Sequence, residues 1–149
     1  MTDDLLDLAT AHLTGLIPVL GHMGVRVVEV APGRVAAEAP FEGNANHVGT
    51  MYAGVLYSVA EVLGGVMGTA TFDASRYATI IKGAEIRYLR AARTAVRSRA
   101  VLGEAEVARV AAEVEAVGKS DFVLEVEVTD ADGTVVARLR GDYQLRAVS

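Results

Sequence analysis

Residues 48–72 read VGTMYAGVLYSVAEVLGGVMGTATF, and this stretch decides the fold. It carries a single charge, Glu61, so apolar residues fall on every side of a helix with about 3.6 residues per turn. Such a helix needs to be buried on most of its faces. A membrane span is disfavoured because Glu61 lies in mid-span and no basic flank closes either end. The pattern therefore predicts a long helix wrapped by its own protein.

The rest of the chain predicts strands that can cover this helix. Alternating and β-branched residues predict strands at 24–29, 34–39, 78–90, 94–102, 122–129 and 134–145. Ala31-Pro32-Gly33 supplies a tight turn between the first two strands, and Asp130-Ala131-Asp132-Gly133 supplies one between the last two. The Gly- and Asn-rich residues 41–49 predict a shaped loop.

The alternation also predicts which side chains face the core. In 78–90, Ala84, Ile86 and Tyr88 fall on one face, and Glu85 and Arg87 fall on the other. In 94–102, the residues at 96, 98 and 100 are small or apolar, and those at 97 and 99 are arginines. Each of these strands is expected to bury one face.

Two further segments have helical spacing. Residues 3–14 predict a short amphipathic helix with Thr2 as cap and Gly15 as stop. Residues 104–117 fit a helix or a strand, and we favour a short helix. One long apolar helix followed by antiparallel strands predicts an α+β fold in which the sheet curls around the helix, in a single domain over 1–149.

Composition narrows the classes of function. The chain is 52% hydrophobic and 22% charged, which excludes intrinsic disorder. Its net charge of −5 speaks against nucleic acid as a partner. It has no cysteine, which excludes disulfides and a Cys nucleophile, and its three separated histidines make a metal site unexpected. The acidic N-terminus lacks a signal-peptide pattern, so we expect a cytoplasmic protein that does not bind membranes.

Glu61 is the strongest candidate for chemistry. A carboxylate on an apolar helix is costly to desolvate, so it needs partners or takes a raised pKa, and this makes it a candidate general base. Gly54 lies seven residues earlier, two helical turns away on the same face. A backbone N–H near the helix start can polarise a carbonyl oxygen that gains negative charge. One helix thus offers an electrophile-polarising end and a base.

The segment from Asn46 to Glu61 resembles the signature of hotdog-fold acyl-CoA thioesterases of the phenylacetate-pathway and 4-hydroxybenzoyl-CoA type. In that signature an Asn, a His-Gly-Gly and an Asp or Glu recur at fixed spacing. Asn46 matches the Asn, Tyr52-Ala53-Gly54 matches His-Gly-Gly, and Glu61 matches the acidic residue. The resemblance covers most of the chain, from the helix at 3–14 through Tyr143, and it implies the hotdog fold.

The resemblance implies a role for each matching residue. Glu61 would activate water or attack the thioester carbon, the Gly54 N–H would hold the carbonyl oxygen, and Asn46 would orient water or substrate. Tyr52 stands where the family has His, and its hydroxyl can still donate a hydrogen bond. The resemblance also implies that no cofactor is needed beyond the coenzyme A of the substrate. It further implies a homodimer or homotetramer, with Glu61 of one chain facing Asn46 of the other.

Further residues are candidates for substrate binding. Tyr57 and Ser58 lie one turn from Glu61, and Val55 is one of the apolar helix residues expected near an acyl tunnel. Arg87 and Arg90 belong to a cluster with the arginines at 93, 97 and 99. Such a cluster forms either a solvated sheet face or a clamp for the phosphates of coenzyme A.

Structural roles compete with each of these assignments. Glu61 can form an ion pair at a subunit seam, Asn46 can be a turn residue, and Tyr57 can be a core aromatic. Two other functions also fit the fold: a non-catalytic acyl-CoA or lipid-binding module, and another acyl-CoA enzyme such as a hydratase. Loss of thioester hydrolysis on replacing Glu61 separates the thioesterase from both.

Overall fold

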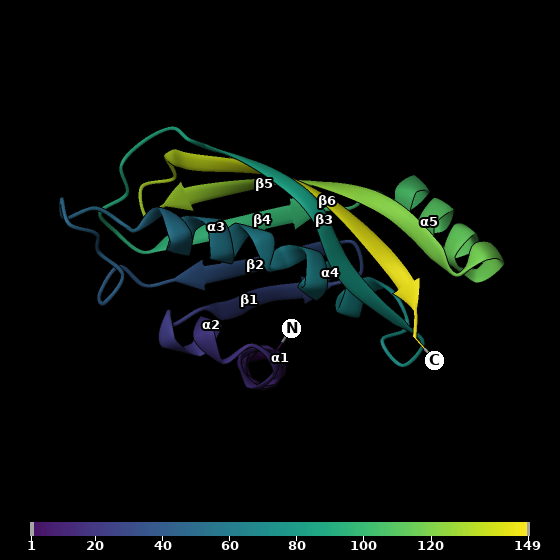
Figure 1. The fold of residues 1–149 in the computed structure, drawn as a ribbon. Coiled ribbons are helices and arrows are strands. Elements are labelled where there is room, and N and C mark those ends of the chain that lie inside the picture. Colours follow the sequence, from purple (N-terminus) through teal and green to yellow (C-terminus); the bar gives the residue numbers. More distant parts are fainter. Residues whose placement is uncertain (1, 149) are drawn as a thin grey trace.

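The computed structural model describes residues 2–148, in which one antiparallel sheet curls around a central helix (Figure 1). The sheet has six strands in the order β1-β2-β4-β5-β6-β3. The strands are β1 (Arg26–Ala31), β2 (Arg34–Ala39), β3 (Tyr77–Tyr88), β4 (Val96–Val101), β5 (Lys119–Asp130) and β6 (Val135–Ala147). The helices are α1 (Asp3–Leu16), α2 (Pro18–His22), α3 (Ala53–Glu61), α4 (Leu63–Thr71) and α5 (Glu104–Val117). The predicted α+β fold is confirmed.

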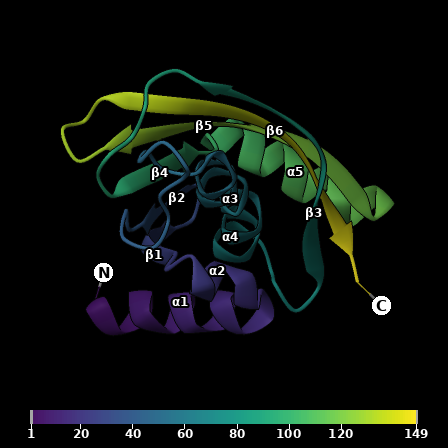
Figure 2. The ribbon, with the colours of Figure 1, turned by 60° about the vertical axis from the view of Figure 1, so that its left-hand side comes forward.

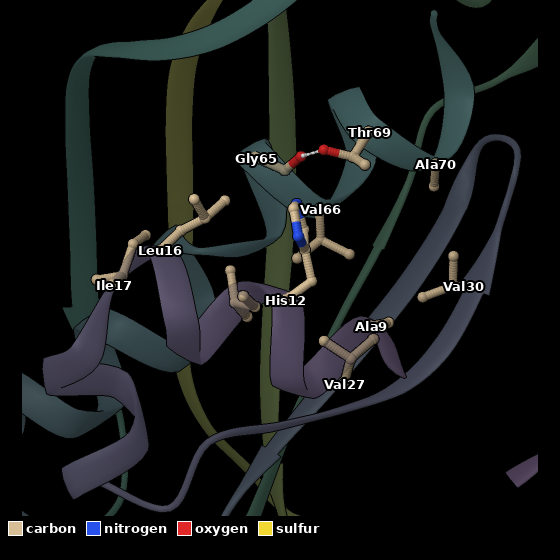
Figure 3. A pocket seen from close by; sticks show the side chains of 11 residues that line it. Ala9, His12, Leu16, Ile17, Val27, Val30, Gly65, Val66, Thr69 and Ala70 are labelled. Carbon is tan, nitrogen blue, oxygen red and sulfur yellow. Dashed lines mark hydrogen bonds between the residues drawn. The ribbon is translucent and has the colours of Figure 1, made fainter. Parts of the chain in front are cut away.

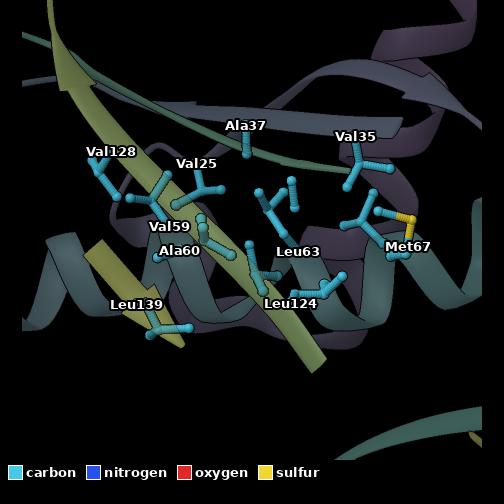
Figure 4. Close-up of a cluster of buried hydrophobic side chains, with 14 of the residues drawn as sticks. Val25, Val35, Ala37, Val59, Ala60, Leu63, Met67, Leu124, Val128 and Leu139 are labelled. Atoms are coloured by element: carbon cyan, nitrogen blue, oxygen red, sulfur yellow. The ribbon is translucent and has the colours of Figure 1, made fainter. Parts of the chain in front are cut away.

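The core lies between the central helix and the concave face of the sheet (Figure 2). Figure 4 shows Val59, Ala60, Leu63 and Met67 of the helix packed beside Leu124 of β5, and all five have no exposed surface. The predicted alternation of β4 is correct, since its even-numbered residues are buried and its arginines are exposed. Each strand contributes every second side chain to this layer. The helix meets that layer with apolar residues on all sides that face the sheet.

The central helix is shorter than predicted and is broken. Helix α3 begins at Ala53, whereas the expected helix began at residue 48. Residues 48–52 stay outside it because the Asn46 side chain accepts hydrogen bonds from the Val48 and Thr50 N–H groups, and Gly49 has a φ of +79°. The helix ends at Glu61 and resumes as α4 after Val62. Ala53–Thr71 is long and apolar enough to cross a membrane, but here it is the core helix, with just over half of it buried.

The N-terminal helix also differs from the prediction. Helix α1 runs through Gly15 to Leu16, and the chain turns at Ile17 into α2, which the sequence analysis missed. No residue of α1 is fully buried. The helix is held along the β1 edge of the sheet, where the Thr10 hydroxyl accepts a hydrogen bond from the Val27 N–H at 2.9 Å. It therefore covers one edge of the sheet without entering the core.

The remaining predictions concern α5 and β3. Residues 104–117 form a helix, as favoured, and Gly118 ends it with a φ of +83°. Strand β3 is the edge strand beyond β6, and it is more exposed than predicted. Of the three residues expected on its buried face, Ile86 is half-buried, while Ala84 and Tyr88 are exposed. An edge strand has a neighbour on one side only, so alternation alone overstated its burial.

Candidate active site

The first turn of α3 presents backbone donors. The N–H groups of Ala53 and Gly54 lie too early in the helix for intrahelical partners, and no other acceptor bonds them within residues 2–148. The ring of Tyr52 lies against Gly54, and a Cβ on that residue would overlap it. Gly54 therefore allows a close approach to the backbone, and the neighbour that now uses this space is the Tyr52 side chain.

Two more tyrosines gather at this end of the helix. The Tyr88 hydroxyl, carried by β3, donates a hydrogen bond to the Ala53 carbonyl oxygen at 3.2 Å. The pKa of Tyr88 is raised, first by burial and then by the neighbouring Tyr52 and Tyr57 hydroxyls. The alternation of residues 78–90 predicts that Tyr88 faces the core. The alternation identified its face, but only the sheet register brings its hydroxyl to the start of α3.

The side-chain amide of Asn46 forms its hydrogen bonds within its own loop. Its Oδ1 accepts from the Val48 and Thr50 N–H groups, and its Nδ2 donates to the Thr50 hydroxyl at 2.8 Å. These bonds give Asn46 the role of a turn residue. It also lines a shallow pocket of about 300 Å³ at the N-terminal end of α3, together with Ala53, Tyr88 and Arg90.

Glu61 lies at the other end of α3, in a different pocket. This pocket has a volume of about 130 Å³, and residues of α1, β3 and β6 surround the carboxylate. Its lining consists of Leu13, Ile17, Glu61, Val62, Gly65, Thr79, Ile80, Ile81 and Tyr143. In the described part of the chain no Arg or Lys pairs with Glu61, and burial raises the pKa of its carboxyl above the usual 4.5. The group thus has the unpaired, desolvated character of a general base.

Tyr143 of β6 holds the backbone of Glu61 in place. Its hydroxyl donates to the Glu61 carbonyl oxygen at 2.8 Å, at the point where α3 ends. The ring is 1% exposed, stacks on Phe122 at 5.6 Å, and occupies space that a Cβ on Gly64 or Gly141 would need. The sequence pattern did not predict this role of Tyr143. The signal was a Tyr in a strand facing a Gly-rich helix, and it is visible only once the register is known.

The two candidate groups lie on one helix but do not share a pocket. Gly54 and Glu61 are separated by two helical turns, a rise of about 10 Å. Asn46 lines the pocket at the start of α3, and Glu61 lines the pocket at its end. Glu61 and Asn46 therefore do not meet within one chain, and their predicted meeting across two chains stays a prediction.

The sequence matches the model of a protein family, the domain of unknown function DUF4442, over residues 7–145. The chain belongs to the DUF4442 family. No curated protein matches its sequence significantly.

Solved structures share the fold of this DUF4442 chain. A protein of unknown function from Pseudomonas aeruginosa, described as a probable thioesterase, is 34% identical and aligns over 95% of both chains with a TM-score of 0.88. A proposed thioesterase from Shewanella oneidensis is 22% identical over 99% of this chain and 100% of its own, with a TM-score of 0.77. A thioesterase from Haemophilus influenzae is 16% identical over 93% and 90%, with a TM-score of 0.71. The resemblance to hotdog-fold thioesterases is confirmed.

The other predicted helix residues of the DUF4442 chain take structural positions. Val55 is 3% exposed and belongs to the core, so it offers no surface to a substrate within the single chain. Ser58 donates its hydroxyl hydrogen bond to the Gly54 carbonyl oxygen at 2.7 Å. Tyr57 is half-buried and packs against the core. In the single chain Val55 therefore has a packing position, and its expected role in substrate binding stays a prediction.

The predicted arginine cluster is divided between two places. Arg87 lies 3.2 Å from Glu85, and Arg97 reaches Glu38 at 4.0 Å, so both take part in ion pairs on the outer face of the sheet. Arg90 instead lines the pocket at the start of α3. Of the two predicted substrate-binding arginines, Arg90 lies at the start of α3 and Arg87 lies on the outer face of the sheet. Within residues 2–148 no three His, Asp or Glu side chains gather as a metal site would require.

Proposed function

We propose that this chain is a thioesterase that hydrolyses an acyl-CoA thioester to a free acid and coenzyme A. The single observation that carries the proposal is Glu61: an unpaired, half-buried carboxylate with a raised pKa, two turns from the free N–H of Gly54. The description of the 34% identical Pseudomonas aeruginosa protein as a probable thioesterase supports the same class of reaction.

The proposed chemistry combines groups from the two ends of α3, contributed by two copies of the chain. The Glu61 carboxylate takes a proton from water as the water oxygen attacks the thioester carbonyl carbon. The Gly54 N–H of a second copy of the chain donates a hydrogen bond to the carbonyl oxygen as it becomes an oxyanion. The C–S bond then breaks, and the thiolate of coenzyme A receives the proton from Glu61. Alternatively, Glu61 attacks the carbon itself and the C–S bond breaks to release the coenzyme A thiolate. Water then hydrolyses the resulting anhydride, which frees the acid and restores the Glu61 carboxylate.

The active form is proposed to be an assembly of at least two copies. Strand β3 is a free edge that exposes Ile80 and Ile81 at 42% and 37%, and both line the Glu61 pocket. Free edges and exposed apolar residues favour pairing with another chain. A second copy would add groups to the Glu61 pocket, including those of the Asn46 loop. Coenzyme A enters only as part of the substrate.

The test is release of free thiol from short, long and aromatic acyl-CoAs. Wild type is compared with Glu61→Gln and Glu61→Ala, and with Glu127→Gln on the outer face of the sheet as the matched control. We expect both Glu61 variants to lose at least about 100-fold in kcat/KM, roughly 2.7 kcal/mol of transition-state stabilisation. The control is expected to keep wild-type activity.

Two results would contradict the proposal. Equal activity of the Glu61 variants and wild type would remove Glu61 from the reaction. Tight acyl-CoA binding without turnover, unchanged in Glu61→Gln, would make the chain a binding module instead.

A further inference from the structure

A second cavity adjoins the Glu61 pocket on the side of α1. It has a volume of about 240 Å³ and lies between α1, β1 and α4 (Figure 3). Its lining is Ala9, His12, Leu13, Leu16, Ile17, Val27, Val30, Gly65, Val66, Thr69 and Ala70. His12 and Thr69 are the polar side chains of this lining, and the Thr69 hydroxyl already donates to the Gly65 carbonyl oxygen at 3.1 Å. The cavity is thus a mainly apolar space at the edge of the core, to which Val27 and Val66 of its lining belong.

This cavity continues into the Glu61 pocket. Leu13, Ile17 and Gly65 line both spaces. Gly65 lies four residues after Glu61, about one helical turn away, and a Cβ placed on it would meet nothing within 4 Å. The absence of a side chain at 65 leaves the junction between the carboxylate and the apolar cavity open.

The cavity is elongated. Along α1 its lining extends from Leu16 to Ala9, a rise of about 10 Å, and Figure 3 shows Leu16 and Ile17 on one side and Ala9 on the other. A volume of 240 Å³ corresponds to about eight units of roughly 30 Å³, the size of a water molecule and close to that of a methylene group. Length and volume together fit a linear alkyl chain better than an aromatic ring.

We propose that this cavity binds the acyl chain of the substrate, and that the chain is a linear aliphatic one of about eight carbons. The inference rests on the proposed thioester hydrolysis, whose reacting carbon would lie at Glu61. From there the acyl chain passes Gly65 and runs between α1 and α4 toward Ala9. This cavity does not include Val55, the helix residue expected near an acyl tunnel, which is 3% exposed in the single chain.

Three leucine substitutions test the cavity. Gly65→Leu closes the junction and Ala9→Leu fills the far end. Both introduce leucine, a residue that favours helix. Gly15→Leu is the matched control because a Cβ on Gly15, also helical, would meet nothing within 4 Å, and Gly15 does not line the cavity. Ala9 is half-buried and lines the cavity, so a longer side chain at this position has the cavity to extend into.

The first readout is kcat/KM against butyryl-, octanoyl-, dodecanoyl- and benzoyl-CoA. Wild type is expected to prefer octanoyl-CoA, because each buried methylene contributes about fourfold to binding. Gly65→Leu should lower the ratio of octanoyl-CoA to butyryl-CoA hydrolysis tenfold or more. Ala9→Leu should shift the preference to shorter chains, and Gly15→Leu should match wild type.

The second readout is calorimetric binding of decanoate, which involves no thioester chemistry. We expect wild type and Gly15→Leu to bind decanoate, and Gly65→Leu and Ala9→Leu to bind it at least tenfold more weakly. If thioesters are hydrolysed but both cavity variants keep the wild-type chain preference and decanoate affinity, the cavity proposal is wrong and the thioesterase proposal stands. A preference of wild type for benzoyl-CoA would likewise overturn the cavity proposal and leave the thioesterase proposal standing.

The opposite result separates the two proposals in the other direction. If no thioester is hydrolysed but decanoate binds and the cavity variants weaken it, the cavity binds aliphatic chains and the thioesterase proposal fails. If there is neither hydrolysis nor binding, both proposals are overturned.

Discussion

On the outer face of the sheet, charged side chains stand opposite partners on neighbouring strands, whereas on the helix side Glu61 stands alone. Glu127 of β5 meets Arg138 of β6 at 3.5 Å, and Glu125 meets Arg140 at 3.8 Å. All four are more than half exposed. Water can solvate these charges with or without the partner, so they shape the surface and leave the fold unaffected. The Glu61 carboxylate is partly shielded from water and has no such partner, which makes it the candidate for a chemical role.

The largest effect is expected where the helix side is packed most tightly. Gly64→Ala would drive a Cβ into the Tyr143 ring and should destabilise the fold by about 1–3 kcal/mol. Its neighbour provides the control: Gly65→Ala enters open space on the same helix and should be neutral or stabilise by up to about 1 kcal/mol. Urea denaturation of both variants checks this. Equal unfolding free energies for the two variants would mean that the Tyr143 ring can move aside without destabilising the fold.

A smaller loss is expected from the hydroxyl that anchors Glu61. Tyr143→Phe keeps the ring and its stacking but leaves the Glu61 carbonyl oxygen without its donor. We expect a loss of about 1 kcal/mol in unfolding free energy. Thiol release should fall with it, through a lower kcat, if the hydrogen bond positions the carboxylate. Unchanged stability would show that water replaces the hydroxyl.

The lone charge also predicts a pH dependence of stability. Because burial raises the pKa of Glu61, the folded protein binds its proton more tightly than the unfolded chain does. Stability is therefore lost as pH rises from about 4.5 through the raised pKa. Glu61→Gln should have a higher melting temperature than wild type at pH 7–8, and the difference should vanish below pH 4.5. Glu127→Gln should show no such difference, and parallel melting curves for wild type and Glu61→Gln at all pH values would contradict the burial of this charge.

The smallest effect is expected on the outer face. A double-mutant cycle of Glu127→Ala and Arg138→Ala should give a coupling of about 0.2–1 kcal/mol. The coupling should disappear near 1 M salt because screening is strong there. A larger coupling energy that persists in salt would contradict the view that the outer-face ion pairs are solvated and contribute little to stability.

The sequence by itself determined the plan of this protein. A helix with apolar residues on every side has to be wrapped, and strands with period-two alternation can wrap it, so the α+β architecture and the candidate Glu61 follow from local pattern. The hairpin of β1 and β2, helix α5 and the two long C-terminal strands were all predicted. These features depend on neighbours a few residues apart, which is the range that periodicity and turn residues report.

The tertiary structure alone decided how the site is assembled. The register of β6 and β3 brings Tyr143 to the Glu61 carbonyl oxygen and Tyr88 to the first turn of α3. The Asn46 loop shortens the helix by bonding to its own backbone, and Val55 enters the core. Each of these outcomes joins residues far apart in sequence or depends on competition between local hydrogen bonds and the helix. A one-dimensional pattern carries no information on either, because both are settled by packing in three dimensions.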